Sequence, residues 1–151
     1  MNNTQDAFDK EVRRYVYDSF INWGTAARIE ETAQALGSTP DYARAAYRRL
    51  ADAHILVLQG DGEILMANPF SAVPTSFRVE AEGRSWWGNC IWDALGIPAM
   101  VKHDARILTA CGDCNDAMTL TIQDGTLLET SPGIIHFSVP AKQWWDNIKF
   151  T

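Results

Sequence analysis

The chain has 151 residues, of which 46% are hydrophobic and 11% aromatic, enough to bury one good core or two small ones. Its net charge of −6 argues against a partner dominated by phosphate, such as bulk nucleic acid. No apolar run approaches the roughly 20 residues of a membrane helix, and the polar N-terminus MNNTQDAFDK does not resemble a secretory signal. We therefore expect a soluble, cytoplasmic protein with no membrane partner.

The first half of the chain predicts three helices followed by a β-hairpin. Apolar residues recur at helical spacing over residues 8–23, and a second short helix is expected over residues 28–37. A third helix begins at Pro40, behind Thr39 as its capping residue. In residues 54–67, two apolar runs flank Gly-Asp-Gly, which indicates a hairpin.

The second half predicts mostly strands with short helices. Short apolar runs separated by Gly, Asp, Asn or Pro give the expected strands, at residues 77–80, 105–110, 118–122, 126–130 and 134–139. A short helix near Cys90–Leu95, closed by Gly96 and Pro98, interrupts these strands. A last helical turn is expected over residues 141–147.

These elements predict an α+β protein with two domains. Residues 1–67 form a winged-helix-like three-helix region with a hairpin, and residues 68–151 form a small mixed β-sheet region with short helices. The third helix carries Arg44, Arg48 and Arg49, which could contact phosphate if a winged helix bound DNA. Because the first 70 residues hold seven Lys or Arg against ten Asp or Glu, a solvated helix face is the favoured interpretation.

Cys90 and Asp93 lie three positions apart in the segment SWWGNCIWDALGIPA. With Asn89 as the N-cap, Cys90 falls in the first helical turn, where backbone N–H groups and the helix dipole lower the pKa of a thiol. Residues i and i+3 share a helix face, so the carboxyl group can approach the sulfur, and one of the two must hold its proton more tightly. The pair then combines a soft nucleophile with a proton donor.

C-x-x-D by itself favours a plainer interpretation, in which Cys90 is a small buried hydrophobe and Asp93 makes a local hydrogen bond. The surrounding aromatic residues bear on this choice. Trp86, Trp87 and Trp92 could form an apolar wall that excludes water and raises the pKa of the acid.

The stretch MANPFSAVPTSFRVEAEGRSWWGNCIWDALGIPAM resembles the alkylmercury lyases, also called organomercurial lyases. In that family a winged-helix-like region precedes a mixed-strand catalytic region, which opens with an aromatic-rich segment, then Cys-x-x-Asp, a leucine and a proline. The positions that match this order are Cys90, Asp93, Leu95 and Pro98. The resemblance covers nearly the whole chain, most clearly residues 66–150, and includes the segment HFSVPAKQWWDNIKF.

The resemblance implies cleavage of a carbon–mercury bond. Cys90 would bind the mercury of R–Hg⁺, a soft ion that prefers thiolate. Asp93 would take the thiol proton and deliver it to the carbon, releasing R–H. The bound product Hg(II) would leave to small thiols or to a mercury-accepting protein, and no organic cofactor is required. Trp87 and Trp92 are the candidate substrate-binding residues.

The family also uses a second cysteine downstream, which we expect just beyond KQWWDNIKFT, so the sequence resembles a family member that lacks its C-terminal segment. Cys111 and Cys114, in a C-G-D-C turn, are candidate replacements and candidate metal ligands. A structural zinc site requires four ligands, and His54, His103 and His136 have no suitable spacing. Reduced thiols at a strand end are therefore favoured over zinc binding or disulfide exchange; in the family, a cysteine near Cys111 is structural.

Two other functions remain open at this point. One is a thiol site that captures soft metals without breaking a carbon–metal bond, which mercury binding without hydrocarbon release would indicate. The other is a winged-helix regulator that senses metal through Cys90, Cys111 and Cys114. Salt-sensitive binding to a specific duplex would indicate the regulator, and the negative net charge argues against it.

Overall fold

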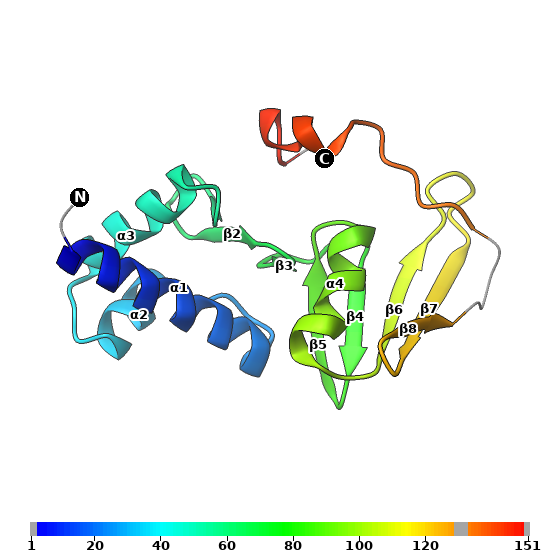
Figure 1. Cartoon of the computed structure of the whole chain (residues 1–151), viewed down its shortest axis with the longest axis horizontal. Helices are drawn as coiled ribbons and strands as arrows, with labels where there is room; N and C mark the ends of the chain where they lie inside the picture. The colour runs from blue at the N-terminus through cyan, green and yellow to red at the C-terminus, as the bar shows by residue number, and fades with distance from the viewer. Residues whose placement is uncertain (1–2, 129–132, 150–151) are drawn as a thin grey trace.

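The fold of this computed structural model consists of three helices, an eight-stranded sheet with one inserted helix, and a final helical turn (Figure 1). The structure describes residues 3–128 and 133–149. The elements are α1 (Asn3–Trp23), α2 (Ile29–Ala35), α3 (Pro40–Asp52), β1 (Val57–Leu58), β2 (Ile64–Ala67), β3 (Phe70–Ser71), β4 (Arg78–Ala81), β5 (Arg84–Gly88), α4 (Ile91–Val101), β6 (Ala105–Ala110), β7 (Ala117–Gln123), β8 (Thr126–Leu128) and the 3₁₀ turn η1 (Ala141–Asp146).

The sheet has the order β1-β2-β3-β5-β4-β6-β7-β8, and its described pairs are all antiparallel. The predicted α+β class is confirmed, but the sheet is antiparallel rather than mixed. Strands β5 and β6 run in the same direction but are not neighbours, because β4 lies between them. The connection from β5 to β6, which contains α4, passes over β4.

One face of this sheet carries the core. Val79 on β4 pairs with Trp86 on β5 and with Ile107 on β6, and all three side chains are buried. The indole Nε1 of Trp86 donates to the carbonyl of Phe20 over 2.6 Å, which fixes the end of α1 against this face. Phe20 in turn stacks on Phe70 of β3 with ring centroids 5.1 Å apart. The sheet and the core therefore run without a break across residue 67, where the domain boundary was predicted; the two-domain division stays a prediction.

The N-terminal helices form where the sequence predicted them. Thr39 caps α3 by accepting the amide of Tyr42 over 3.3 Å, and Pro40 occupies the first helical position. Gly37, with a φ of 61°, ends α2. The predicted hairpin is the pair β1–β2.

Three elements differ from the sequence prediction. Residues 84–88 form strand β5, which was not predicted. Helix α4 continues through Gly96 and Pro98 to Val101, because burial of Ile97 and Pro98 against the sheet outweighs the hydrogen bond that the proline cannot donate. Residues 134–139 form no strand, and Ile134 is 95% exposed. The last two residues of the strand predicted over 126–130 lie outside the described residues.

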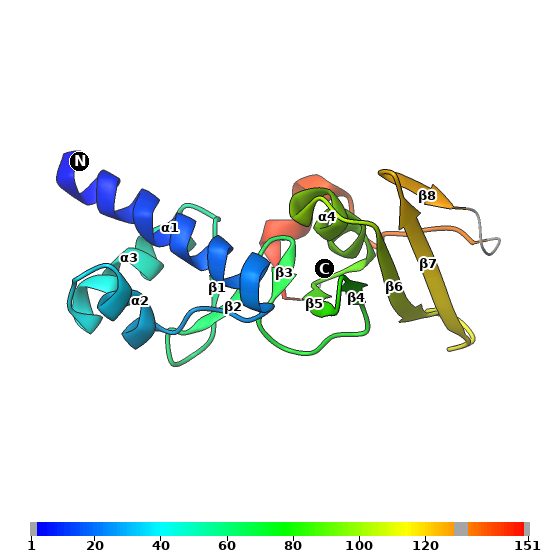
Figure 2. The same ribbon diagram turned by 90° about the horizontal axis from the view of Figure 1, so that it is seen from below.

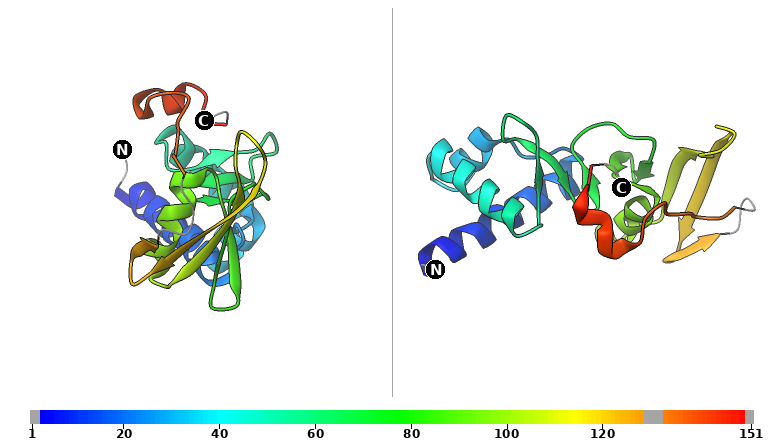
Figure 3. Two further views of the ribbon diagram at one scale, coloured as in Figure 1. Left: turned by 90° about the vertical axis from the view of Figure 1, so that its right-hand side faces the viewer. Right: turned by 90° about the horizontal axis from the view of Figure 1, so that it is seen from above.

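The C-terminal segment returns from the β8 side of the sheet past α4 toward the N-terminal helices (Figures 1 and 3). The view from below shows the same order, with the three helices at one end of an elongated molecule and β7 and β8 at the other (Figure 2). Within residues 3–128 and 133–149, no helix combines the length and the apolar character needed to cross a bilayer.

Candidate active site

The Cys90 site lies where β5 ends and α4 begins. The amide of Gly88 donates to the carbonyl of Phe77 over 2.9 Å, and the hydroxyl of Thr75 donates to the carbonyl of Gly88 over 2.6 Å. A Cβ at Gly88 would lie 2.8 Å from the amide nitrogen of Ala94, closer than real contacts allow. Glycine therefore lets the first turn of α4 fold tightly against the strand that precedes it.

Cys90 is the capping residue of α4, since the helix begins at Ile91. The prediction that Asn89 is the cap was wrong by one position. Burial is the largest effect on the Cys90 thiol and raises its pKa, and the charge of Asp93 adds to this, while backbone N–H groups of Asp93 and Trp92 oppose it. The predicted lowering of this pKa was also wrong, because loss of hydration outweighs the helix N-terminus.

The side chains of Asp93 and Cys90 lie close enough for each to shift the pKa of the other. Burial raises the pKa of Asp93 above its ordinary value, and hydrogen bonds from Asn89 and Cys90 offset part of this effect. Both pKa values lie above their ordinary values, so each group of the pair holds a proton more tightly than it would in water. A thiol proton and a carboxyl group close to it are thus already in place.

Two asparagines frame this pair, and sequence reasoning missed their role. Asn89 Nδ2 donates to Asp93 Oδ2 over 3.0 Å and to Asn68 Oδ1 over 3.0 Å. The backbone carbonyl of Asn68 accepts the hydroxyl of Tyr17, on α1, over 3.0 Å. The site is therefore built from α1, the β2–β3 turn and the start of α4. The sequence feature that could have indicated this role is the position of Asn89 directly before Cys90.

The three tryptophans around Cys90 in sequence separate in space. Trp86 lies in the core. Trp87 follows it on β5 and so points to the opposite face of the sheet, where the guanidinium of Arg78 lies 5.9 Å from its ring centroid. Trp92 stands in the first turn of α4 and is 61% exposed. Of the three tryptophans, Trp92 is the one that lies on α4, in the same turn as Asp93. The substrate-binding roles of Trp87 and Trp92 stay predictions.

The C-terminal segment brings further aromatic rings to the start of α4. Phe137 lies edge-on to Trp92 at 6.4 Å, and Trp144 lies 5.4 Å from Phe137. Trp145 stacks on His54, just after α3, at 4.2 Å. The segment is thus held at both the α4 and the α3 side. Sequence reasoning assigned Phe137 to a strand and missed its place beside Trp92.

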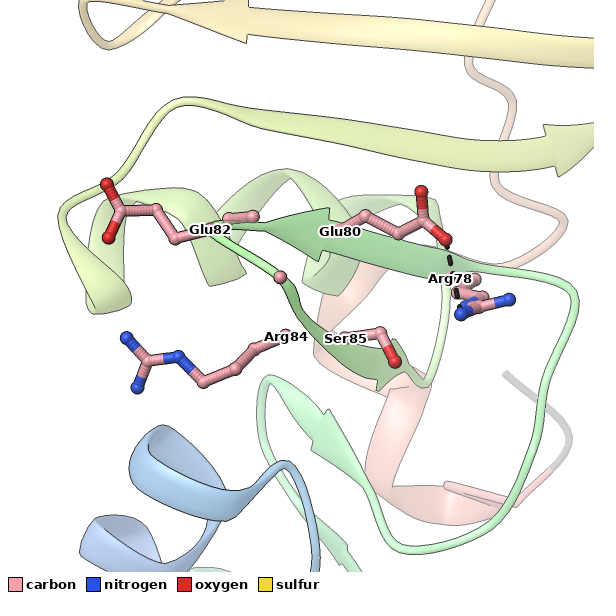
Figure 4. A pocket seen from close by; sticks show the side chains of 7 residues that line it. Arg78, Glu80, Glu82, Arg84 and Ser85 are labelled. Atoms are coloured by element: carbon pink, nitrogen blue, oxygen red, sulfur yellow. Dashed lines mark ion pairs between the residues drawn. The ribbon is translucent and has the colours of Figure 1, made fainter.

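Two cavities are lined by residues other than Cys90 and Asp93. One, of about 340 Å³, lies at the β4–β5 hairpin, where Arg78 pairs with Glu80 over 3.2 Å (Figure 4). In the β4–β5 register, Arg78 lies opposite Trp87 and Glu80 lies opposite Ser85. These residues lie on the face of the sheet opposite to Trp86. The other, of about 380 Å³, lies between the end of α4 and the β7–β8 turn. Neither is lined by residues of the first turn of α4, where Cys90 and Asp93 lie.

Cys111 and Cys114 lie in the turn between β6 and β7, apart from Cys90 in the chain, and all three cysteines are free. Hydrogen bonds from the backbone of Cys114 and of Asp113 lower the pKa of Cys111, and the Cys114 thiol adds to this effect. Within the described residues, no group of three or more His, Cys, Asp or Glu is arranged to hold a metal ion. Zinc at this pair, which the sequence analysis did not favour, stays untested.

The α3 arginines predicted to be solvated are in part engaged within the fold. Arg49 Nη2 pairs with Asp9 Oδ1 over 2.6 Å, and Arg44 Nη1 donates to the carbonyl of Asp61 over 3.0 Å. Arg48 is exposed. These contacts tie α3 to α1 and to the hairpin turn.

Comparison with known proteins places this geometry in a family. The family described as alkylmercury lyase matches residues 70–151, more than half of the chain and including Cys90 and Asp93. A solved structure of the mercury-bound form of MerB2 shares the fold with a TM-score of 0.63 at 19% identity, covering 85% of this chain and 67% of that chain. No curated protein matches the chain.

Proposed function

The chain belongs to the alkylmercury lyase family, and we propose that it cleaves the carbon–mercury bond of organomercurials by protonolysis at Cys90 and Asp93. The observation that carries this proposal is the placement of Cys90 and Asp93 together at the start of α4, where each side chain shifts the pKa of the other. A simple mercury-binding thiol needs no such acid. A lyase needs both a soft ligand for mercury and a proton for carbon.

Capture of the substrate begins at the sulfur. The Cys90 thiol forms a sulfur–mercury bond with R–Hg⁺ and releases its proton. The carboxylate of Asp93 is the acceptor close to that thiol, and burial raises its pKa, so it is suited to hold the proton. The backbone N–H groups of Trp92 and Asp93 stabilise negative charge on the sulfur while the proton leaves.

Cleavage then returns this proton to carbon. Asp93 delivers H⁺ to the carbon bonded to mercury, and the electron pair of the carbon–mercury bond becomes the new carbon–hydrogen bond. The products are R–H and Hg(II) on the sulfur of Cys90, so mercury does not change oxidation state and no electron donor is consumed. Small thiols in solution remove the ion by exchange, returning a proton to Cys90.

The organic group of the substrate would lie on the aromatic surface formed by Trp92 and Phe137. Trp92 follows Cys90 by two residues, and the two rings meet edge to face 6.4 Å apart. An aromatic surface at the start of α4 would offer favourable contact to an apolar group and limit water at the carbon that receives the proton. This assigns Trp92 a direct role and gives no such role to Trp87.

Steady-state release of hydrocarbon tests the proposal. The purified chain is given phenylmercury with excess small thiol, and benzene is measured for the wild type, Cys90→Ser, Asp93→Asn and the control Asp41→Asn. Asp41 is exposed in the first turn of α3, so its variant matches the charge change away from the site. We expect loss of about 10²–10⁴-fold in the two site variants, as for removal of a general acid, and retention in the control.

Failure of this test has a definite meaning. If the wild type binds phenylmercury one-to-one through Cys90 and releases no benzene, the chain captures mercury without cleaving the bond. Benzene release that persists in Cys90→Ser would also overturn the assignment.

A further inference from the structure

We infer that Cys111 and Cys114 form a second, two-coordinate site for a soft metal ion, with mercuric ion as its ligand. The identity of the ion rests on the proposed function, which generates Hg(II) at Cys90. The site itself rests on the geometry of the β6–β7 turn. It adds a binding site to the chain, separate from the place where the carbon–mercury bond is cleaved.

The turn holds the two thiols together. The amide of Cys111 donates to the carbonyl of Asp116 over 2.8 Å, and the amide of Asn115 donates to the carbonyl of Cys111 over 3.0 Å. The two thiol side chains lie close enough for each to shift the pKa of the other. Backbone N–H groups of Cys114 and Asp113 lower the pKa of Cys111. The pKa of Cys114 is raised, because the lowering by the backbone N–H of Asp116 is outweighed by the side chains of Asp116 and Cys111. The turn thus favours the thiolate at Cys111 and the proton at Cys114.

The ligand count selects the kind of ion. Zinc requires four protein or water ligands, usually with Cys or His in all positions of a structural site. In the part of the chain that the structure describes, no third His, Cys, Asp or Glu joins this pair. A mercuric ion needs only two thiolates in a linear arrangement, and thiolate is the ligand that soft ions prefer. The exposed Gly112 and Asp113 leave the sulfurs room to lie on opposite sides of the ion.

The fold also places this pair at the same edge of the sheet as Cys90. Arg78 on β4 pairs with Trp87 on one side and with Leu108 on the other. Cys90 follows Trp87 by three residues, and Cys111 follows Leu108 by three residues. The start of α4 and the β6–β7 loop accordingly lie at one end of the sheet (Figure 1), on strands separated by two spacings, about 10 Å. Hg(II) released at Cys90 thus emerges at the end of the sheet that carries Cys111, which is partly exposed, and Cys114, which is exposed.

Binding is an exchange of protons for metal. Two sulfur–mercury bonds form, the thiol protons pass to the buffer or to the departing small thiolates, and no electron is transferred. Because the two thiolates belong to one chain, the second bond forms within the same molecule, and the pair outcompetes a single free thiol of similar basicity.

The experiment uses the full reduced chain with Cys90→Ser, which removes the catalytic thiol. Mercuric chloride is added with excess monothiol, small molecules are removed, and retained mercury is counted per chain. Cys90→Ser should retain one equivalent, and so should Cys90→Ser/Gly112→Ala, since nothing lies within 4 Å of a Cβ at Gly112. Cys90→Ser/Cys114→Ser should retain at least tenfold less, as should the cysteine-free chain.

The inference is overturned if Cys90→Ser, with two reduced thiols titrated, retains no more mercury than the cysteine-free chain. Circular dichroism of each variant establishes that it is folded. Because Cys90 is absent throughout, this outcome is independent of hydrocarbon release by the wild type, so failure here and failure of the proposed lyase activity are separate results.

Discussion

The side-chain amide of Asn89 donates a 3.0 Å hydrogen bond to the carboxylate of Asp93, which also lies close to the thiol of Cys90. The carboxylate is therefore restrained from one side by a neutral donor, and in the proposed reaction it would exchange a proton with the thiol on the other. Asn89 is itself held by Asn68, on the turn before β3. This relationship identifies Asn89 as a positioning residue for the acid.

Replacing Asn89 by alanine should change the pH dependence of benzene release as well as its rate. The Asn89 hydrogen bond lowers the pKa of Asp93, so its removal raises that pKa and moves the acid limb of the pH–rate profile to higher pH. We expect a rate loss of about 10–100-fold, as for other supporting hydrogen bonds. Asn22→Ala, at an exposed position of α1, should leave the profile unmoved. A lower rate with an unshifted acid limb would show that Asn89 acts on structure alone.

Asp93→Asn should lose most of the activity and yet stabilise the fold at neutral pH. Burial raises the pKa of Asp93, so the native state binds this proton more tightly than the unfolded chain does. The resulting stability is present below the ordinary aspartate value of 3.8 and is lost as pH rises through the folded pKa. Urea unfolding should therefore show a larger advantage for Asp93→Asn at neutral pH than in acid. Equal unfolding free energies at both pH values would contradict the buried-acid assignment.

Gly88→Ala and Gly96→Ala are matched substitutions on either side of Cys90 and Asp93 in the chain. A Cβ at Gly88 would lie 2.8 Å from the amide nitrogen of Ala94, whereas one at Gly96 meets only Pro69, at 3.8 Å. We expect Gly88→Ala to lower the free energy of unfolding by about 1–3 kcal/mol and to displace Cys90. Gly96→Ala should be neutral or raise it by up to about 1 kcal/mol. Urea titrations of both decide this, and equal effects would contradict the close approach of α4 to β5.

Trp92→Ala should alter selectivity among substrates. Loss of the exposed ring removes a wall for the organic group, so the Michaelis constant for phenylmercury should rise several-fold more than that for methylmercury, which has little surface to bury. Trp23→Ala, which removes a ring that is 77% exposed on α1, is the matched control. A parallel change for both substrates would place Trp92 outside the binding surface.

The sequence predicted the helices well because their signals are local. Thr39, Pro40 and Gly37 fix the ends of α2 and α3 through capping and turn chemistry that acts within a few residues. The end of α4 was mispredicted because a distant contact decides it. Pro98 is buried against the sheet, and that packing keeps the helix intact beyond a residue that usually ends one.

The strands were harder, since their pairing depends on distant partners. Strand β5 contains Trp86 and Trp87, which sequence reasoning kept together as one aromatic wall. Pairing with β4 instead gives them opposite faces, and one joins the core. Residues 134–139 have the composition of a strand, but the structure gives them no pairing partner, and Phe137 packs on Trp92 instead.

At the site, the sequence predicted that Cys90 and Asp93 lie together but not their electrostatics, and their catalytic roles stay predictions. The i, i+3 spacing predicted that Cys90 and Asp93 meet, and the structure brings them together. The pKa of Cys90 was predicted in the wrong direction because burial is invisible in spacing. Asn89 was taken for a helix cap, whereas its amide bonds to Asp93.

A single-turnover experiment tests the central claim most directly. Stoichiometric phenylmercury is mixed with the chain in the absence of small thiol, and benzene is measured together with the mass of the intact protein. The wild type should release one benzene per chain and retain Hg(II), Asp93→Asn should retain the uncleaved phenylmercury on Cys90, and Cys90→Ser should give no benzene. Release by Asp93→Asn at the wild-type rate, or uncleaved phenylmercury on the wild type, would contradict the account.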